Sequence, residues 1–323
     1  LSGNMIDICP VGALTSAAYR FQARPFDLKS TTTSCDHCAG GCEIRADHRH
    51  HQVKRHQAGD APEVNEEWLC DKGRFGFVSG RGEDRLTRPL VRRNGVLQAA
   101  SWPEAIDAAV AGLKAAGTAV GVLPGGRLTV ENAYAYSRFA RTVLGTNNID
   151  FRSRAASEEE AEFLAARIAG RGMDVTYADL EAATHVVLVS YEPEDETSVV
   201  FLRLRKAVRK HGLKVTTLAP FASRGTQKLS ATLIPVAPGA EAQTLEAMEL
   251  EEGTIILVGE RAACQPGLLS EVSSKAIRSG ARLAWMPRRA GDMGAIATGC
   301  LPGLLPGGRP VASAEARVDM AAA

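Results

Sequence analysis

The sequence predicts two parts of different construction: a small cysteine-rich module near the start of the chain, and an α/β domain on a parallel sheet after it. Two observations carry this prediction. Four of the seven cysteines lie between residues 35 and 70, and beyond residue 100 short apolar runs without polar alternation are separated by helical patterns. Such runs indicate strands that helices cover on both faces of a parallel sheet. The length of 323 residues is enough for both parts.

The first 29 residues carry a single cysteine, Cys9, followed directly by Pro10. Proline removes a hydrogen-bond donor and fixes the turn, so that nearby backbone amides can face the sulfur. Ferredoxin-type domains present a last cluster ligand in this way, and residues 1–29 are interpreted as the end of such a domain. One cysteine cannot hold a cluster alone. Its companions would precede Leu1, or Cys9 is a stray buried cysteine.

Residues 30–88 are predicted to form a module around Cys35, Cys38, Cys42 and Cys70. The first three follow the pattern C-x2-C-x3-C, and the fourth comes after 27 further residues. Four thiolates hold an iron–sulfur cluster, and a tight trio with a distant single cysteine favours [4Fe–4S]. Structural zinc sites usually bring cysteines as two close pairs, so zinc is a competing interpretation. The third interpretation is that these cysteines bind no metal and are free or disulfide-bonded.

Polar residues fill the stretch between Cys42 and Cys70, and four of them are histidines: His48, His50, His51 and His56. Histidine is a common metal ligand, but the abundance of arginine and lysine here favours a solvent-exposed hairpin. Lys72 lies two residues after Cys70. It is either a solvated lysine or a cation that offsets the charge of a cluster and contacts a neighbouring redox group.

The α/β domain is predicted over residues 89–323. Ser101 is the expected N-cap of its first helix, and Gly212 is expected to end a later one. The predicted helices cover residues 103–116, 131–144, 157–168, 196–210, 242–249 and 268–279. The predicted strands cover residues 119–123, 185–190, 214–218, 231–235, 254–258 and 281–285. Ligands of parallel sheets bind beyond the carboxyl ends of the strands, which points to loops 124–130, 190–197 and 219–226.

The loop after the predicted strand 185–190 is acidic, with Glu192, Glu194, Asp195 and Glu196. A nucleotide phosphate binds to backbone amides at a helix N-terminus free of anions, so these acids oppose a bound pyrophosphate. A capped and solvated turn accounts for them equally well. Cys264 and Cys300 lie far from the cysteine module and are predicted to be buried structural residues.

Composition excludes several functions. The net charge of +1 and the aromatic content of 5% give no sign of a nucleic-acid partner. No apolar run approaches the length of about 20 residues that a membrane span needs. Clustered cysteines favour metal binding in a reducing, cytoplasmic compartment over a secreted disulfide framework. The start has no signal peptide and no Met, and both termini are expected to be cuts through a longer protein.

These residues carry a resemblance to a known superfamily. The four-cysteine pattern, with Asp-Lys-Gly-Arg-Phe after Cys70, resembles the cluster module that opens the molybdopterin oxidoreductases. The stretch 101–105 is similar to the start of their pterin-binding part, and residues 139–141 and 144–150 are similar to the segment before their metal-ligand loop. The fold that the resemblance implies is a small iron–sulfur module followed by a parallel-sheet, molybdopterin-oxidoreductase-like domain.

Within the superfamily, the chain most resembles the family of G subunits from the bacterial proton-pumping NADH–quinone oxidoreductases, respiratory complex I. Three stretches carry this resemblance: residues 3–25, 126–134 and 299–309. It implies that Cys35, Cys38, Cys42 and Cys70 hold a [4Fe–4S] cluster found in only some bacterial members, off the main electron route. It also implies that Cys9 is the last ligand of a second [4Fe–4S] cluster, with its other ligands and a [2Fe–2S] domain upstream.

Two departures from the superfamily pattern are expected to matter. Where formate dehydrogenase-type relatives have a Cys or selenocysteine that ligates molybdenum, this chain has Ala156, which offers no donor atom. Where relatives bind the pterin nucleotide with a Gly-x-Asn-Pro turn, this chain has Ser190-Tyr191-Glu192-Pro193. The large domain is therefore interpreted as a former catalytic scaffold without molybdenum or pterin.

The resemblance implies an electron-transfer subunit, which carries electrons from NADH and flavin toward quinone and has no substrate-converting site of its own. Its partners would be the other peripheral-arm subunits, namely the flavin- and NADH-binding subunit and further iron–sulfur subunits. It would lie at the cytoplasmic face of the inner membrane and touch the membrane only through the complex. Two alternatives stay open: a molybdopterin-dependent oxidoreductase of the formate dehydrogenase type, and a non-redox scaffold that binds zinc.

Overall fold

The computed structural model describes residues 3–322, so the outermost residues of the predicted ranges 1–29 and 89–323 lie outside the described residues. After a short helix α1 (Asn4–Asp7) and a 3₁₀ turn η1 (Pro25–Asp27), the chain forms a three-stranded antiparallel sheet. Its strands are β1 (Lys29–Ser34), β2 (Glu43–Arg49) and β3 (Gln52–Ala58), in the order β1-β2-β3. The helix α2 (Asp71–Phe75) packs against β3.

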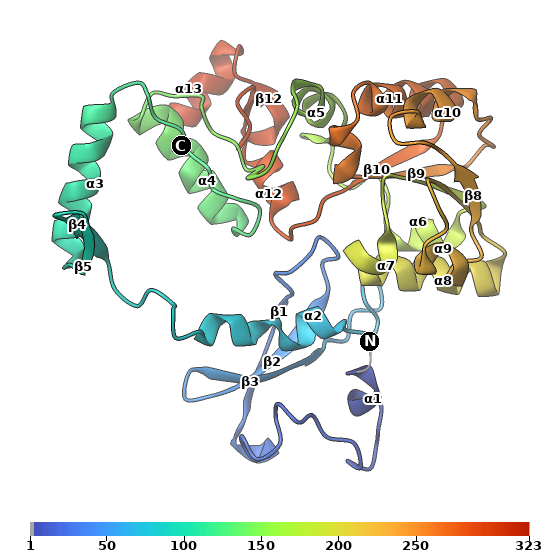
Figure 1. The fold of residues 1–323 in the computed structure, drawn as a ribbon, viewed down its shortest axis with the longest axis horizontal. Helices are drawn as coiled ribbons and strands as arrows, with labels where there is room; N and C mark the ends of the chain where they lie inside the picture. The colour runs from blue at the N-terminus through green and yellow to red at the C-terminus, as the bar shows by residue number, and fades with distance from the viewer. Residues whose placement is uncertain (1–2, 323) are drawn as a thin grey trace.

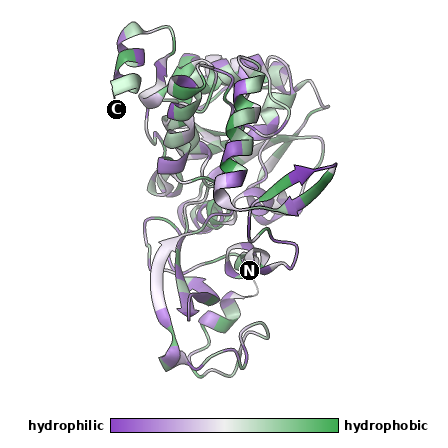
Figure 2. Cartoon of the chain, turned by 90° about the vertical axis from the view of Figure 1, so that its left-hand side faces the viewer, coloured by the Kyte–Doolittle hydropathy of each residue, from purple (hydrophilic) through white to green (hydrophobic). Residues whose placement is uncertain are grey.

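An arm joins this small sheet to the α/β domain (Figure 1). It runs through the 3₁₀ helix η2 (Gly76–Arg81), the hairpin of β4 (Leu90–Arg93) and β5 (Val96–Ala99), and helix α3 (Trp102–Ala116). The prediction of a helix capped by Ser101 is confirmed, because the Ser101 side chain accepts a hydrogen bond from the Glu104 amide. Helix α3 has no buried residue, and the hairpin projects from the body in Figure 2.

The α/β domain is built on a five-stranded parallel sheet of order β10-β9-β6-β7-β8, which confirms the predicted fold class. The central strand β6 pairs with β7 and β9, so Val187 lies opposite both Thr216 and Ile256. The predicted strands end within one residue of the observed ones: β6 (His185–Val189), β7 (Lys214–Ala219), β8 (Thr232–Pro235), β9 (Ile255–Gly259) and β10 (Arg282–Met286).

Helices cover both faces of this sheet, as Figure 1 shows. Along β6, Val187 and Val189 belong to one hydrophobic core, while Val186 and Leu188 belong to another. The first core includes side chains of α10 (Glu241–Ala247) and α11 (Leu268–Ser279). The second includes side chains of α6 (Tyr177–Ala182), α8 (Ser198–His211) and the turn after α9 (Arg224–Lys228). The lack of polar alternation in the strands therefore has a direct cause, because neither face meets water.

Several helices differ from their predicted form while occupying the predicted residues. The predicted helix 131–144 is α4 (Val130–Arg138), which continues as a π-helical turn, Phe139–Val143. The predicted helix 157–168 is α5 (Glu158–Phe163), again followed by a π turn. The remaining elements are α7 (Pro193–Glu196), η5 (Glu260–Cys264), α12 (Asp292–Ala297), β11 (Leu304–Leu305), η6 (Pro306–Gly308), β12 (Arg309–Pro310) and α13 (Ala314–Ala322).

Two predictions for this domain are wrong. Residues 119–123 do not form a strand, since only Val122 pairs with another segment, through a single parallel bridge to Ile149. Pro124 ends the extended run at once, and Leu123 is 70% exposed, so the segment offers no continuous apolar face to a sheet. Cys264 is exposed at the end of η5, whereas Cys300 is fully buried and its thiol donates to the Ala133 carbonyl at 3.3 Å.

None of the helices in residues 3–322 combines the length and the apolar character that crossing a bilayer requires.

A buried carboxyl pair lies near the first core. Asp292 is 3% exposed, and its Oδ2 accepts a hydrogen bond from the Arg289 amide at 3.0 Å. Burial, together with the nearby Glu260 carboxylate, raises the pKa of Asp292 to about 7. Glu260 in turn accepts hydrogen bonds from Arg154 and from the Arg288 amide, so the two acids form one site that holds a proton at mildly acidic pH.

We predict that Asp292 makes the stability of this domain fall as the pH rises. Between about pH 4 and about pH 7 the folded protein keeps a proton on Asp292 that the unfolded chain has lost. Urea unfolding at several pH values should therefore give a free energy of unfolding that decreases over this interval. Asp292→Asn, which mimics the protonated acid, should flatten the decrease. An equal slope in both proteins would contradict the assignment.

Candidate iron–sulfur site

Three of the predicted site cysteines come from one loop. Cys35 follows β1 directly and Cys42 precedes β2 directly, and the Cys35 amide donates to the Cys42 carbonyl at 2.9 Å, which closes the loop that carries Cys38. Cys70 is the N-cap of α2, and its Sγ accepts a hydrogen bond from the Gly73 amide at 3.4 Å. A helix N-terminus favours a negative group, so this position suits a thiolate.

The structure brings these four thiols together. Cys35 and Cys42 are buried, whereas Cys38 and Cys70 are half-buried. Burial, with a smaller contribution from other thiols of the set, raises the pKa of Cys35 to about 11 and that of Cys42 to about 12. Cys70 acts electrostatically on all three others. Since such influence fades with distance, the distant cysteine of the sequence lies beside the trio in space.

Backbone amides face the sulfurs of this site. The His37 amide is directed at Cys35 and the Gly40 amide at Cys38, and both lower the pKa of the thiol that they face. Hydrogen bonds of this kind stabilise negative sulfur. Glycine is needed where the chain passes closest: a Cβ on Gly73 would lie 3.1 Å from Cys35 Sγ and 2.8 Å from a methyl of Leu69.

Charged and aromatic residues surround the four thiols. Lys72 is exposed, yet its ammonium group lowers the pKa of Cys38, so it lies within electrostatic reach of the site. His50 and His51 form the tip of the β2–β3 hairpin, which confirms the predicted hairpin. His56 turns back toward α2, where its Nδ1 lies 3.0 Å from the Gly73 carbonyl and its ring lies 4.8 Å from that of Phe77.

Cys9 lies apart in a turn of its own. Its sulfur is approached by the amides of Leu14, Val11, Ala13 and Gly12, which together lower the pKa of the thiol. Successive amides that converge on one point form an anion-binding nest. Cys9 thus stands in a setting that favours the thiolate, whereas burial makes the thiolate unfavourable at Cys35, Cys38 and Cys42.

The segment that carries Cys9 is attached to the helix after Cys70. Asn4 Oδ1 accepts hydrogen bonds from the Leu69 amide at 3.0 Å and from Arg74 at 2.9 Å. Arg74 is 4% exposed and also pairs with Asp7 at 2.5 Å. These contacts join residues more than 60 positions apart, and they explain why the polar Asn4 is buried.

The four-cysteine module is fastened to the α/β domain by residues that sequence reasoning missed. Arg203 of α8 donates to the Val64 carbonyl at 3.0 Å and pairs with Glu66 and Glu181. The Tyr177 hydroxyl of α6 donates to the Gly40 carbonyl at 2.7 Å, in the loop between Cys38 and Cys42. Cys35 and Cys42 belong to the same hydrophobic core as one face of the parallel sheet. The apolar spacing along the helices could predict that this face of the parallel sheet is buried. It could not predict that the four-cysteine module packs there.

Asn65 is a second residue that the sequence did not indicate. It is 2% exposed, and its side-chain amide bonds both the amide and the carbonyl of Glu43, at 2.8 and 3.1 Å, and the Trp68 carbonyl at 2.9 Å. It therefore joins the chain just after Cys42 to the chain just before Cys70. No sequence signal marks it, because an asparagine in a polar stretch is typical of an ordinary turn.

Ion pairs fill the region around residues 150–160. Arg152 pairs with Asp150 at 2.7 Å and with the fully buried Glu160 at 3.1 Å, and Arg154 pairs with Glu160 and Glu260. At the end of β6, Glu196 pairs with Arg261 at 2.8 Å and with Arg288 at 3.2 Å. The acids of the 190–196 loop are therefore partly neutralised by protein cations, and the loop is a capped turn.

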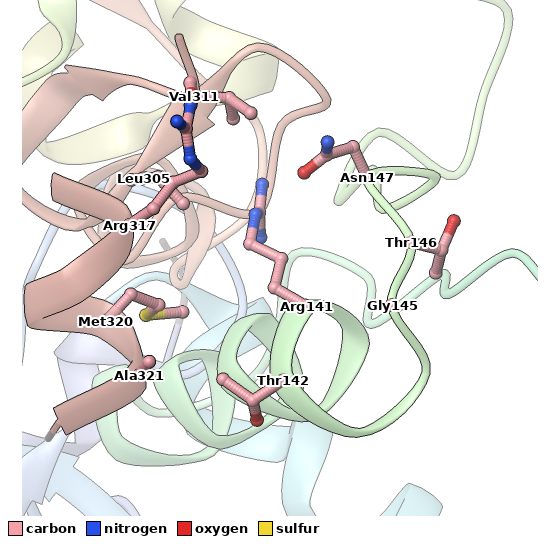
Figure 3. Close-up of a pocket in the computed structure, with 10 residues that line it drawn as sticks. All are labelled: Arg141, Thr142, Gly145, Thr146, Asn147, Leu305, Val311, Arg317, Met320 and Ala321. Carbon is pink, nitrogen blue, oxygen red and sulfur yellow. The ribbon is translucent and has the colours of Figure 1, made fainter. Parts of the chain in front are cut away.

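A separate cavity of about 290 Å³ lies between the π turn after α4, the loop 145–147 and α13 (Figure 3). Arg141 enters it, and its guanidinium donates to the carbonyls of Leu301 and Leu304 at 2.9 and 2.6 Å. Arg317 donates to the Val311 carbonyl. Both arginines thus hold main-chain segments in place, and none of the five predicted site cysteines lines this cavity.

Within residues 3–322, no three His, Cys, Asp or Glu side chains are arranged closely enough to share one metal ion. A [4Fe–4S] cluster is held in another way, by four cysteine thiolates around a larger group.

Two family models match parts of the chain. The sequence model of the molybdopterin oxidoreductase family matches residues 85–263, and that of the molybdopterin oxidoreductase Fe4S4 domain matches residues 28–79. The second match contains Cys35, Cys38, Cys42 and Cys70. Cys9 lies outside both matches.

Among individual proteins, the G subunit of the NADH-quinone oxidoreductase of Streptomyces coelicolor is 54% identical, over 99% of this chain and 42% of its own length. The G subunit of the Mycobacterium bovis enzyme is 55% identical, over 100% of this chain and 41% of its own. NADH-quinone oxidoreductase subunit 3 of Thermus thermophilus is 40% identical over 64% of this chain. The chain thus spans about two fifths of the length of the first two relatives.

We predict that Arg203→Met detaches the four-cysteine module from α8. The change leaves the Val64 carbonyl without its donor, which costs about 1–3 kcal/mol, and leaves Glu66 and Glu181 with Lys206 as a remaining cation. Limited proteolysis should then cut residues 60–68 faster than in the parent protein. Arg209→Met on the exposed side of the same helix is the control. Equal cutting rates in the two variants would show that Arg203 does not hold the module to α8.

We also predict that Asn4→Ala frees the segment that carries Cys9. The Leu69 amide loses its acceptor, which costs about 1–3 kcal/mol for a buried donor. Hydrogen exchange at Leu69 should accelerate about tenfold or more, while Gln22→Ala, a change at an exposed position, should leave it unaltered. Unchanged exchange in Asn4→Ala would show that the segment is held by other contacts.

Proposed function

We propose an electron-transfer function from one premise: the chain belongs to the molybdopterin oxidoreductase family and is similar over its whole length to the G subunits of NADH-quinone oxidoreductases. In this proposal it is part of a subunit of the proton-pumping NADH:quinone oxidoreductase, respiratory complex I. Electrons taken from NADH by a flavin on a neighbouring subunit pass toward quinone. The chain itself converts no substrate.

The observation that carries the proposal is the convergence of Cys35, Cys38, Cys42 and Cys70 in one partly buried site with amides directed at its sulfurs. We assign these four residues as the ligands of a [4Fe–4S] cluster. Four thiols in a low-dielectric site with amide donors suit this group, which accepts and releases one electron when bound. The thiols must lose their protons on binding, because the thiolate is the ligand.

We assign Cys9 as a ligand of a second [4Fe–4S] cluster, completed by cysteines that precede this chain, together with a [2Fe–2S] site further upstream. The support is the nest of four amides around the Cys9 sulfur and the attachment of its segment to α2 through Asn4 and Arg74. A turn fixed in this way offers one thiolate from a rigid support. Clusters in a chain of electron carriers need such rigidity, because their spacing sets how well electrons pass.

We divide the chain into residues 1–29, which end a ferredoxin-type domain, the [4Fe–4S] module 30–88, and the α/β domain 89–323. The beginnings of β1 at Lys29 and of β4 at Leu90 support these boundaries. The α/β domain does not fit molybdenum or pterin. Ala156 supplies no ligand atom, and the Arg152–Glu160–Arg154 ion pairs occupy the neighbouring space. We therefore assign it a scaffold role.

The partners in this proposal are the other subunits of the peripheral arm, among them the flavin- and NADH-binding subunit and further iron–sulfur subunits. Association at the cytoplasmic face of the inner membrane would follow from the complex rather than from this chain. Nucleic acid has no place in this function, since the net charge is only +1.

Iron analysis tests the assignment. In the subunit purified without oxygen, Cys70→Ser should lose about four iron atoms and the matching inorganic sulfide, because one thiolate of the four is removed. Cys264→Ser is the matched control, since Cys264 is exposed and lies outside the site, and its iron content should equal that of the parent. Iron and sulfide assays with low-temperature EPR spectroscopy provide the measurement.

Other results would replace the proposal. Zinc in place of iron in the parent protein would favour a structural scaffold. Molybdenum together with pterin would favour a molybdopterin-dependent oxidoreductase of the formate dehydrogenase type and would reject the roles given to Ala156 and Glu192. An iron content that does not change in Cys70→Ser would remove Cys70 from the ligand set.

A further inference from the structure

Two buried hydroxyls lie beside the four-cysteine site without hydrogen-bond partners. Tyr191 is 4% exposed and Thr197 is 0% exposed, and neither hydroxyl oxygen has a partner of normal geometry among the described residues. A buried hydroxyl without a partner costs about 1–3 kcal/mol, so folded proteins rarely keep one. Even if one of two such neighbouring hydroxyls donates to the other, the second still needs an acceptor outside the pair.

Both side chains border the loop that carries Cys38. A Cβ built on Gly40 would lie 3.3 Å from Cγ2 of Thr197 and 3.5 Å from Cys38 Sγ, so Thr197 and the sulfur flank the same glycine. The hydroxyl of Tyr191 lies next to that of Thr197, and Cys38 and Glu196 act on it electrostatically. Burial, which is the largest cause, raises the pKa of Tyr191 well above its ordinary value, so this phenol keeps its proton.

The backbone holds both residues in place. Tyr191 follows Ser190, which turns the chain at the end of β6 with a φ of 49°. Thr197 separates α7 from α8 with φ −148° and ψ 85°, its amide donates to the Pro193 carbonyl at 3.1 Å, and its carbonyl accepts from Phe201. Neither position is a mobile loop tip, since the neighbours Pro193 and Val199 are buried as well.

Neighbouring polar groups do not compete for these hydroxyls. The third hydroxyl of this region, on Tyr177, already donates to the Gly40 carbonyl at 2.7 Å. The Glu192 carboxylate accepts from the Glu194 amide, and the Glu196 carboxylate accepts from the Glu192 amide and pairs with Arg261 and Arg288. The acceptor that remains near these hydroxyls is a sulfur of the site that contains Cys38.

We propose that Tyr191 and Thr197 form a hydrogen-bond relay to the cluster assigned to this site, with the Tyr191 hydroxyl donating to Thr197 Oγ1 and the Thr197 hydroxyl donating to a cluster sulfur. This inference rests on the proposed function. Hydrogen bonds to the sulfurs stabilise the more negative, reduced cluster and so raise its reduction potential. Both residues act through position and hydrogen bonding, and neither is a ligand.

The test is a redox titration of the cluster EPR signal in the anaerobically purified subunit. Thr197→Val, nearly equal in shape, should lower the ratio of reduced to oxidised cluster about tenfold at a fixed ambient potential, because a hydrogen bond to a charged acceptor is lost. For one electron this tenfold change corresponds to about 59 mV. Thr197→Ser should restore the parent value.

Tyr191→Phe provides the second arm, and it removes an atom with no partner among the described residues, so folding should be preserved. It should shift the ratio in the same direction. The double variant should match Thr197→Val alone, because the two hydroxyls act in series. Thr298→Val is the control: this buried threonine lies beside Cys300, which is no proposed ligand, and it should leave the potential unchanged.

Each result is decisive. A parent protein without iron would overturn the proposed function itself. A parent with its cluster, combined with an unshifted potential in both Thr197→Val and Tyr191→Phe, would overturn only the relay. Equal potentials in Thr197→Val and Thr197→Ser would likewise overturn it, since a structural effect of the branched side chain would then explain any shift. Loss of the cluster in Thr197→Val leaves Tyr191→Phe to decide.

Discussion

Burial of four thiols between a small antiparallel sheet and the α/β domain is the constraint on which the remaining structure depends. The chain must bring Cys70 to the loop 35–42 and must pass the backbone within contact distance of the sulfurs, which Gly40 and Gly73 allow. It must also close the site from the other side. Tyr177 and Arg203 do so from α6 and α8, and one hydrophobic core runs from Cys35 and Cys42 to the parallel sheet.

The same constraint explains the state of the α/β domain. Parallel sheets usually offer the carboxyl ends of their strands to a ligand. Here the end of β6 is taken up by the acidic turn, whose Glu196 pairs with Arg261 and Arg288, and by Tyr191, which faces the four-cysteine module. The carboxyl end of β6 thus supports a neighbouring module. The buried charges of this domain keep partners, as Glu160 does with Arg152 and Arg154.

Errors in the sequence-based prediction have physical causes. Residues 119–123 are apolar enough for a strand, but a strand needs a neighbour, and only Val122 finds one. Cys264 was expected to be buried because cysteine usually is, yet the 3₁₀ turn after β9 carries it to the surface. Helical spacing predicted a helix over residues 131–144 but could not show that Phe139–Val143 is a π-helical turn, because a single wider turn adds only one residue to the pattern.

By itself, the sequence determined the parallel α/β class and the places of the five strands of the sheet, because these depend on local periodicity. It also indicated that the four cysteines between residues 35 and 70 act as one set, because closely spaced thiols share a chemistry. Only the tertiary structure decided that Asn65 joins the two halves of the cysteine module, that Arg203 fastens it, and that Tyr191 and Thr197 lie unpartnered beside Cys38. Such contacts join residues far apart in the chain. Whether a polar side chain in such a contact is solvated or buried depends on which element folds against it. The spacing of residues along the sequence does not show which element that is.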